Sequence, residues 1–156
     1  MHTILLATGL ALAATGLVWD FRWQRLPNML CLSLAIASLA SAILFETPSA
    51  AVGNAIHAAV ALLVGIILFR LGMIGAGDAK FYAAAALGLP LSRALPFLGW
   101  TSLAGFCLLL GMVAFRLAGR DMGPRDAKGR VLLPYGVAIA TGFWLTQLVH
   151  WPMPSR

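Results

Sequence analysis

The chain has 156 residues, of which 61% are apolar and only 10% are charged, and its mean hydropathy is +0.90. An ordinary soluble domain carries about a quarter charged residues, so this composition excludes one. The net charge of +6 is spread over loops, which favours a role in membrane orientation over nucleic-acid binding. Continuous rather than alternating apolar runs argue against a β-barrel. We expect an all-α, polytopic membrane protein, a single domain over 1–156 with about six transmembrane helices and no separate soluble domain.

Apolar segments follow one another along the chain, each long enough or nearly long enough to cross a bilayer core of about 30 Å. They are predicted at residues 3–19, 29–45, 50–69, 79–91, 95–115 and 133–151. Proline and charged residues mark most of the breaks between them. The fourth segment is the weakest, because its roughly thirteen residues make only about 20 Å of helix.

The basic residues favour six crossings of the membrane. In that arrangement one side carries nine Lys and Arg residues: Arg22, Arg25, Arg70, Lys80, Arg116, Arg120, Arg125, Lys128 and Arg130. The other side carries two, Arg93 and Arg156. Lys and Arg accumulate in cytoplasmic loops, so the first side is expected to face the cytoplasm and both termini to lie outside it. If segment 79–91 did not cross, the basic loop 116–130 would fall on the outer side.

The first segment is expected to stay in the protein as a membrane span. A secretory signal peptide has basic residues before its apolar stretch, whereas here Arg22 and Arg25 come directly after it.

The five acidic residues can be sorted by position. Glu46 lies in a predicted outer loop, while Asp121 and Asp126 lie among basic residues in the large cytoplasmic loop and suit a solvated surface. Asp20 closes the first apolar segment and Asp78 opens the fourth, so both are predicted at the cytoplasmic boundary of the membrane. Carboxylates at such positions are costly to desolvate, which makes them candidates for function.

Two readings of these acids stay open from the residues alone. In one, each acid pairs with a nearby base, Asp20 with Arg22 or Arg25 and Asp78 with Lys80. In the other, the two carboxylates come together and share one proton, so that one activates a water and the other protonates a substrate carbonyl, as in aspartic proteases.

The surroundings of the acids lead to two further expectations. Gly75 and Gly77 allow unusual backbone geometry and leave space beside Asp78, although a loop before a helix would use glycine too. Asp20 sits at a predicted helix C-terminus, where the helix dipole disfavours an anion, and Asp78 sits at an N-terminus, where the dipole favours one. We therefore expect the shared proton on Asp20, with Lys80 strengthening this difference if it reaches Asp78.

Other chemistries have little support in the sequence. There is no HExxH, GxSxG or phosphate-binding glycine loop, and the three histidines, His2, His57 and His150, are far apart. His57 lies inside an apolar segment and is expected to be a packed or hydrogen-bonded helix residue. Cys31 and Cys107 lack the paired spacing of a zinc site. No metal and no cofactor is expected.

Three stretches of the chain, in order, resemble the motifs of the type IV prepilin peptidases. The first is residues 20–28 (DFRWQRLPN), which resemble the family's D-x-R-x-x-R-[IL]-P-N. The second is residues 75–80 (GAGDAK), which resemble GxGD-x-K. The third is residues 133–136 (LPYG), which resemble the P-[FY]-G that opens the last core helix. Each motif alone is weakly specific, and the ordered set is much more so.

The resemblance implies that Asp20 and Asp78 are the catalytic pair of a membrane aspartic endopeptidase. The other motif residues would support the site: Gly75, Gly77, Lys80, Arg22, Arg25, Pro27, Asn28, Pro134, Tyr135 and Gly136. Arg22 and Arg25 would also serve as anchors at the membrane face, and residues 134–136 would also serve as a simple helix start.

The resemblance also implies a substrate and a location. The enzyme would cut a basic leader from a pilin-like precursor, just after a glycine, at the cytoplasmic face of the bacterial inner membrane. The precursor's apolar helix would stay in the bilayer, and no nucleic acid takes part. The chain is similar in size to the small peptidases of tight-adherence (Flp) pilus systems. Longer family members also methylate the new terminus and carry a cytoplasmic domain with paired cysteines, so methylation is not expected here. The sequence does not indicate an oligomeric state.

Two alternatives remain beside this interpretation. Presenilin and signal-peptide-peptidase enzymes also carry GxGD, but they pair it with Tyr-Asp, where this chain has Trp19-Asp20. A small transporter or membrane assembly subunit could use the two acids to bind protons or a cation. In that case the acids would be expected near the middle of the bilayer.

Overall fold

Six α-helices make up most of residues 2–119 and 133–149, the part of the chain that the computed structural model describes. They are α1 (His2–Trp23), α2 (Asn28–Phe45), α3 (Pro48–Arg70), α4 (Ala76–Ala86), α5 (Ala94–Leu117) and α6 (Tyr135–Val149). A short 3-10 helix, η1 (Leu91–Arg93), precedes α5. Within the described ranges there is no strand, and the predicted all-α class is confirmed.

The helices fall into two classes by length. Helices α1, α2, α3 and α5 are the four that are long and apolar enough to cross a membrane. Helix α6 has 15 described residues, whereas α4 has only 11. At 1.5 Å per residue α4 is about 16 Å long, roughly half the thickness of a hydrocarbon core. The weak fourth segment is therefore a short central helix, which ends at Ala86 rather than at residue 91.

Local sequence explains where several helices begin and end. Pro27 has φ −63° and ψ 137°, an extended conformation from which α2 starts at the next residue. The Thr47 hydroxyl accepts a hydrogen bond from the Ala50 amide, and Pro48 occupies the first turn of α3. After α3 the chain turns at Gly72, whose φ of +73° is readily available only to glycine. These breaks lie where proline and charged residues predicted them.

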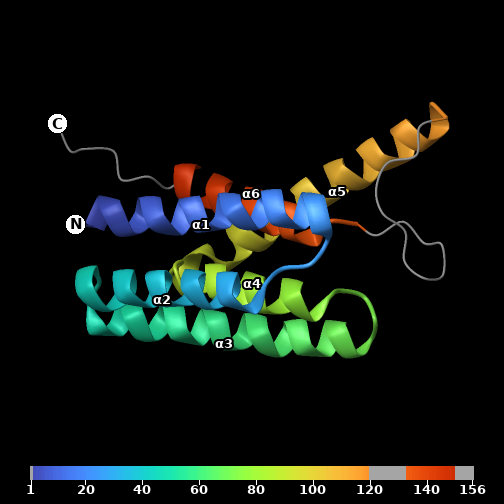
Figure 1. Cartoon of the computed structure of the whole chain (residues 1–156). Coiled ribbons are helices and arrows are strands. Elements are labelled where there is room, and N and C mark those ends of the chain that lie inside the picture. Colours follow the sequence, from blue (N-terminus) through green and yellow to red (C-terminus); the bar gives the residue numbers. More distant parts are fainter. Residues whose placement is uncertain (1, 120–132, 150–156) are drawn as a thin grey trace.

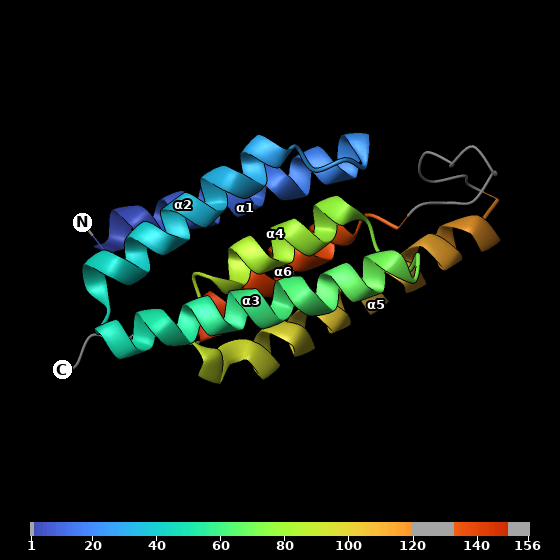
Figure 2. The same cartoon turned by 90° about the horizontal axis from the view of Figure 1, so that it is seen from below.

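Helices α4 and α6 form the centre of the bundle. Helix α4 packs against α2, α3 and α6, and α6 packs in addition against α1 and α5. Seen from below, α1 and α2 lie on one side of this central pair and α3 and α5 on the other (Figure 2). Alanines make α4 narrow, and its one large core side chain, Phe81, is fully buried. A short, slender helix of this kind can be enclosed by longer ones.

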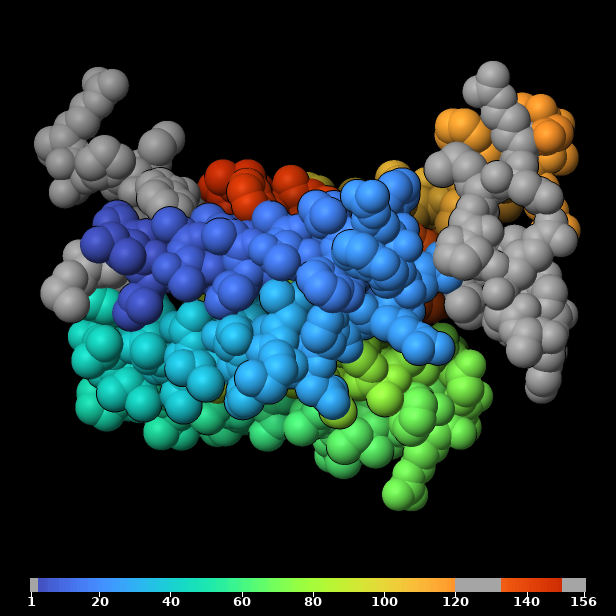
Figure 3. All heavy atoms as spheres, in the orientation of Figure 1, coloured from blue at the N-terminus to red at the C-terminus, as the bar shows by residue number. Residues whose placement is uncertain are grey.

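Large apolar side chains cover the outward faces of the long helices. Ile36 and Ile43 of α2 and Leu63 of α3 are each about 60% exposed. Figure 3 shows one such face, formed by α1, α2 and α3 side by side. Apolar surface of this extent is unsuited to water and is matched by lipid chains.

One end of the bundle, which we call the carboxylate end, holds the ends of α1, α3 and α5 and the beginnings of α2, α4 and α6 (Figure 1). Basic residues gather there: Arg22, Arg25, Arg70, Lys80 and Arg116. Arg93 lies at the opposite end. The expectations for Asp121, Asp126, Arg120, Arg125, Lys128, Arg130 and Arg156 fall on residues outside the described ranges.

At the opposite end, buried polar side chains meet the turn between α4 and α5. The His57 ring, with its proton assigned to Nδ1, donates to the Leu89 carbonyl at 3.1 Å, and Gln147 Nε2 donates to the Gly88 carbonyl at 3.5 Å. We call His57 and Gln147 the polar clamp. Non-helical backbone at membrane depth needs such partners, because lipid offers none. His57 is thus a hydrogen-bonded helix residue, as expected.

Candidate active site

Asp20 lies in the last turns of α1 and is only 4% exposed. Its Oδ2 accepts a hydrogen bond of 2.8 Å from the backbone amide of Gly136, near the start of α6. A Cβ atom on Gly136 would lie 2.8 Å from the Asp20 carboxyl carbon, closer than real contacts allow. Glycine at position 136 is therefore what lets the N-terminus of α6 reach this carboxylate.

Asp78 lies in the first turn of α4 and is partly buried. Its Oδ2 accepts a hydrogen bond of 3.1 Å from the amide of Gly75, the residue that caps the helix. A Cβ atom on Gly75 would come within 2.8 Å of the same oxygen. Like Gly136 beside Asp20, Gly75 leaves room for a carboxylate directly against the backbone.

The structure brings the two carboxylates into electrostatic contact. The pKa of Asp78 is raised to about 6, mainly by burial and also by the negative charge of Asp20, while the Gly75 amide opposes the rise. Two carboxylates that interact in a poorly solvated site hold one proton between them. The two acids singled out from the sequence thus form a pair.

The surroundings of the two acids bear on the location of the shared proton. Burial disfavours the charged form of Asp20, while the amides of Gly136 and Val137 at the N-terminus of α6 favour it. This interaction opposes the unfavourable dipole of α1. The pKa of about 6 favours the proton on Asp78, whereas the sequence predicted it on Asp20. The sequence argument considered only the dipole of the helix that carries each acid.

Lys80 does not pair with Asp78 as one reading allowed. Its ammonium group donates to Asn28 Oδ1 at 3.0 Å, on the exposed surface between α4 and the first residue of α2. Next to this contact, a Cβ on Gly77 would lie 3.3 Å from Leu26 Cβ. Residues of the first two motifs therefore contact each other where the α1–α2 connection crosses the start of α4.

The remaining motif residues lie around the pair. Arg22 and Arg25 are exposed, and the Arg22 guanidinium lies 5.6 Å from the Trp23 ring centroid, which suits an anchoring role at the membrane face. Pro134 is buried just before α6, and the Tyr135 side chain is 36% exposed. The backbone amide of Val137 also faces Asp20 and was not predicted. A backbone amide cannot be recognised from the type of residue, because nearly every amino acid has one.

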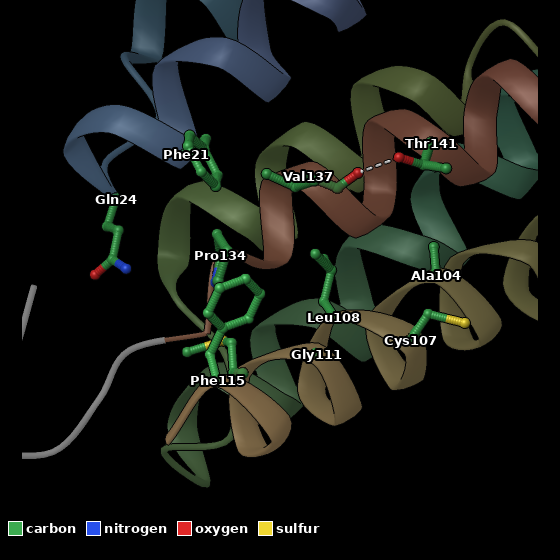
Figure 4. A pocket seen from close by; sticks show the side chains of 11 residues that line it. Phe21, Gln24, Ala104, Cys107, Leu108, Gly111, Phe115, Pro134, Val137 and Thr141 are labelled. Carbon is green, nitrogen blue, oxygen red and sulfur yellow. Dashed lines mark hydrogen bonds between the residues drawn. The ribbon is translucent and has the colours of Figure 1, made fainter. Parts of the chain in front are cut away.

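Two cavities flank α6. One, of about 590 Å³, lies between the end of α1, α5 and α6; Figure 4 shows Phe21, Leu108, Phe115 and Val137 around it. Neither aspartate lines this cavity. The other, of about 510 Å³, lies between α3 and α5, and both Asp78 and Tyr135 contribute to its wall. Within residues 2–119 and 133–149, no three His, Cys, Asp or Glu side chains form a group that could hold a metal ion.

Comparison with known protein families gives one match. The sequence profile of the type IV leader peptidase family matches residues 4–110. The chain belongs to this family. The match covers Asp20, Asp78 and both motifs that carry them, while the α6 motif lies beyond it. None of the curated proteins or solved structures compared with the chain matches it. Membership in the leader peptidase family supports a membrane peptidase that acts on prepilin-type substrates.

Proposed function

We propose that this chain is an aspartic endopeptidase that removes the basic leader from a pilin-like precursor, with Asp20 and Asp78 as its catalytic pair. One observation carries the proposal: two acids from opposite ends of the family match meet at one end of the bundle, close enough for the charge of one to raise the pKa of the other. Gly75 and Gly136 would support the pair through the hydrogen bonds that hold it.

The proton assignment defines the roles of the pair in peptide hydrolysis. The charged Asp20 takes a proton from a water molecule while the water oxygen attacks the scissile carbonyl carbon. Asp78 gives its proton to the carbonyl oxygen, so the tetrahedral intermediate is neutral. When the C–N bond breaks, Asp20 passes its proton to the leaving amine and Asp78 recovers a proton from the intermediate. Each turnover consumes one water and returns the pair to its starting state.

The charge distribution supports an orientation for this chemistry. The carboxylate end carries Arg22, Arg25, Arg70 and Lys80. In the proposed orientation that end faces the cytoplasmic side of the bacterial inner membrane, and both termini lie outside the cytoplasm. The precursor, of the type found in tight-adherence (Flp) pilus systems, presents its leader there while its apolar helix stays in the bilayer. Cleavage of the leader is the proposed activity.

A cleavage assay with charge-neutral variants tests the proposal. The chain is co-expressed with an Flp-type pilin precursor, and leader removal is followed by a size shift on a gel, beside Asp20→Asn and Asp78→Asn. Asparagine keeps the size but cannot exchange protons, so each variant is expected to lose at least about 100-fold in cleavage rate.

The matched control is Glu46→Gln, which changes an acid at the opposite end whose carboxylate contacts Asn54. This variant is expected to cleave within about twofold of the wild type. Cleavage near the wild-type rate by Asp20→Asn or Asp78→Asn, with the protein inserted and stable, would overturn the catalytic pair. In that case the transport or assembly alternative would gain support.

A further inference from the structure

The cavity between α3 and α5 has the form of a groove with two helical walls. Helices α3 and α5 flank α4 and α6 and make almost no contact with each other. On α3 the wall runs from His57 to Leu68 at every third or fourth residue, and on α5 it runs from Ala94 to Leu109 in the same way. The α3 stripe is about 17 Å long at 1.5 Å per residue.

The walls are mainly aliphatic and open to the side of the bundle. Val60 and Val64 on α3 and Leu98 and Phe106 on α5 are each about half exposed. The floor is tightly packed, since a Cβ on Gly65 would lie 2.8 Å from Ala79 Cβ. Paired stripes at helical spacing form the kind of groove that accepts an apolar helix.

One end of this groove reaches the candidate catalytic pair. Asp78 and Tyr135 line it at the carboxylate end, and His57 lines it toward the opposite end. The cavity of Figure 4 is similar in volume and also largely apolar, but neither aspartate lines it. A helix lying in the α3–α5 groove would therefore have one end beside Asp78 and its body in the bilayer.

We propose that the groove between α3 and α5 binds the apolar helix of the precursor and thereby places the peptide bond before that helix at Asp78. This inference rests on the proposed function, and it adds the surface by which the substrate is held. A pilin-like precursor carries its leader immediately before an apolar helix, so the groove and the carboxylate would be occupied by adjacent parts of one chain. The groove thus makes the apolar helix, and not the leader alone, a determinant of specificity.

The test compares two neighbouring residues of α3. Val64 lines the groove, whereas Leu63 lines neither cavity and is 60% exposed on the outer face. Val64→Trp is expected to slow cleavage of the full-length precursor at least about tenfold, and Leu63→Trp less than twofold. A short leader peptide without the apolar helix should be cut slowly, and the wild type and both variants should cut it at the same rate. That peptide separates a blocked groove from a damaged active site.

Cross-linking identifies the occupant directly. A photo-reactive amino acid is placed at position 64 or 63 in the Asp78→Asn variant, in membranes that contain uncut precursor. An adduct with the precursor from position 64 and not from position 63 supports the inference. Adducts with lipid alone, with a second copy of the chain, or equally from both positions overturn it.

The two proposals fail in different ways. If the wild type cleaves and the two Asn variants do not, while Val64→Trp cleaves the full precursor at the wild-type rate, the groove is wrong and the catalytic pair stands. If the wild type cleaves no precursor, both are overturned.

Discussion

Polar side chains lie at both ends of α4, but they are donors at one end and carboxylates at the other. At the opposite end the carbonyls of Gly88 and Leu89 each receive a side-chain donor from the polar clamp. At the carboxylate end two acids come together, and each is held by a backbone amide, that of Gly136 for Asp20 and that of Gly75 for Asp78. The clamp satisfies the backbone after the helix, whereas the acid pair brings two carboxylates together.

The polar clamp explains why so short a helix can lie at the centre of a membrane protein. Helix α4 ends within the depth of the bundle, so the backbone of the following turn needs hydrogen-bond partners inside the protein. His57 and Gln147 provide them. The clamp and the carboxylate pair are thus joined by one 11-residue helix, and changes at the two ends are expected to separate stability from activity.

The largest effect is expected from a methyl group placed against Asp20. In Gly136→Ala the new Cβ would meet the Asp20 carboxyl carbon at 2.8 Å, so the carboxylate and the start of α6 must move apart. A displacement near 1 Å in a catalytic group can cost about 100-fold, and a loss of this size is expected. The cleavage rate per folded enzyme measures it.

The control for this substitution is Gly9→Ala on α1, where a Cβ would meet nothing within 4 Å. It is expected to leave cleavage unchanged. Retention of more than about a third of the activity by Gly136→Ala would mean that the close approach of α6 to Asp20 is not needed.

At the other end of α4, His57→Leu is expected to lower stability more than activity. Removing the ring leaves the Leu89 carbonyl buried without its donor, which costs about 1–3 kcal/mol in the free energy of unfolding. Thermal unfolding in detergent measures the loss, with Ile56→Leu on the neighbouring exposed position as the control. A fall in cleavage per folded enzyme as large as that of Gly136→Ala would contradict the division between the two ends.

The charge of Asp78 is expected to make stability depend on pH. Its pKa rises from the ordinary 3.8 to about 6, so the folded protein holds this proton more tightly than the unfolded chain does. The resulting stabilisation is complete below about pH 4 and is lost as the pH rises through about 6. Above that value Asp78→Asn should be more stable than the wild type. The rise from 3.8 to about 6 corresponds to about 3 kcal/mol at 1.36 kcal/mol per pKa unit, and solvent screening of this partly exposed group reduces it to roughly 1 kcal/mol.

Unfolding curves of both proteins at several pH values check this expectation. The difference between them should vanish near pH 4 and stay constant above about pH 7, if the shift of Asp78 dominates. A stability difference that grows as the pH falls would have the opposite pH dependence and would contradict the raised pKa of Asp78.

The smallest effect is expected at the surface contact between Lys80 and Asn28. Its hydrogen bond of 3.0 Å is exposed, so Asn28→Ala should cost about 0.5 kcal/mol and change cleavage less than threefold. The same assay on Lys80→Gln should give the same result. A much greater loss in Lys80→Gln than in Asn28→Ala would show that the lysine charge acts on the acid pair itself.

Much of the site was accessible from sequence because its signals are local. Asp20 and Asp78 stood out by elimination among five acids, and their positions at the ends of apolar segments predicted one shared side. The family resemblance added Gly75 and Gly136, and the structure adds the reason for each, a carboxylate packed where a Cβ would be. The groove between α3 and α5 had no counterpart in the sequence, since it depends on how far apart two helices pack.

By itself the sequence determined that this is a helical membrane protein with both acids at one end. Long apolar runs can satisfy their backbone in lipid only as helices, and proline, glycine and basic residues act on their immediate surroundings. Only the tertiary structure decided which groups surround each acid, because the amide that donates to Asp20 belongs to Gly136, 116 positions away. The length of α4 was decided in the same way, because the backbone of the turn that follows it receives hydrogen bonds from His57 and Gln147, which belong to two other helices.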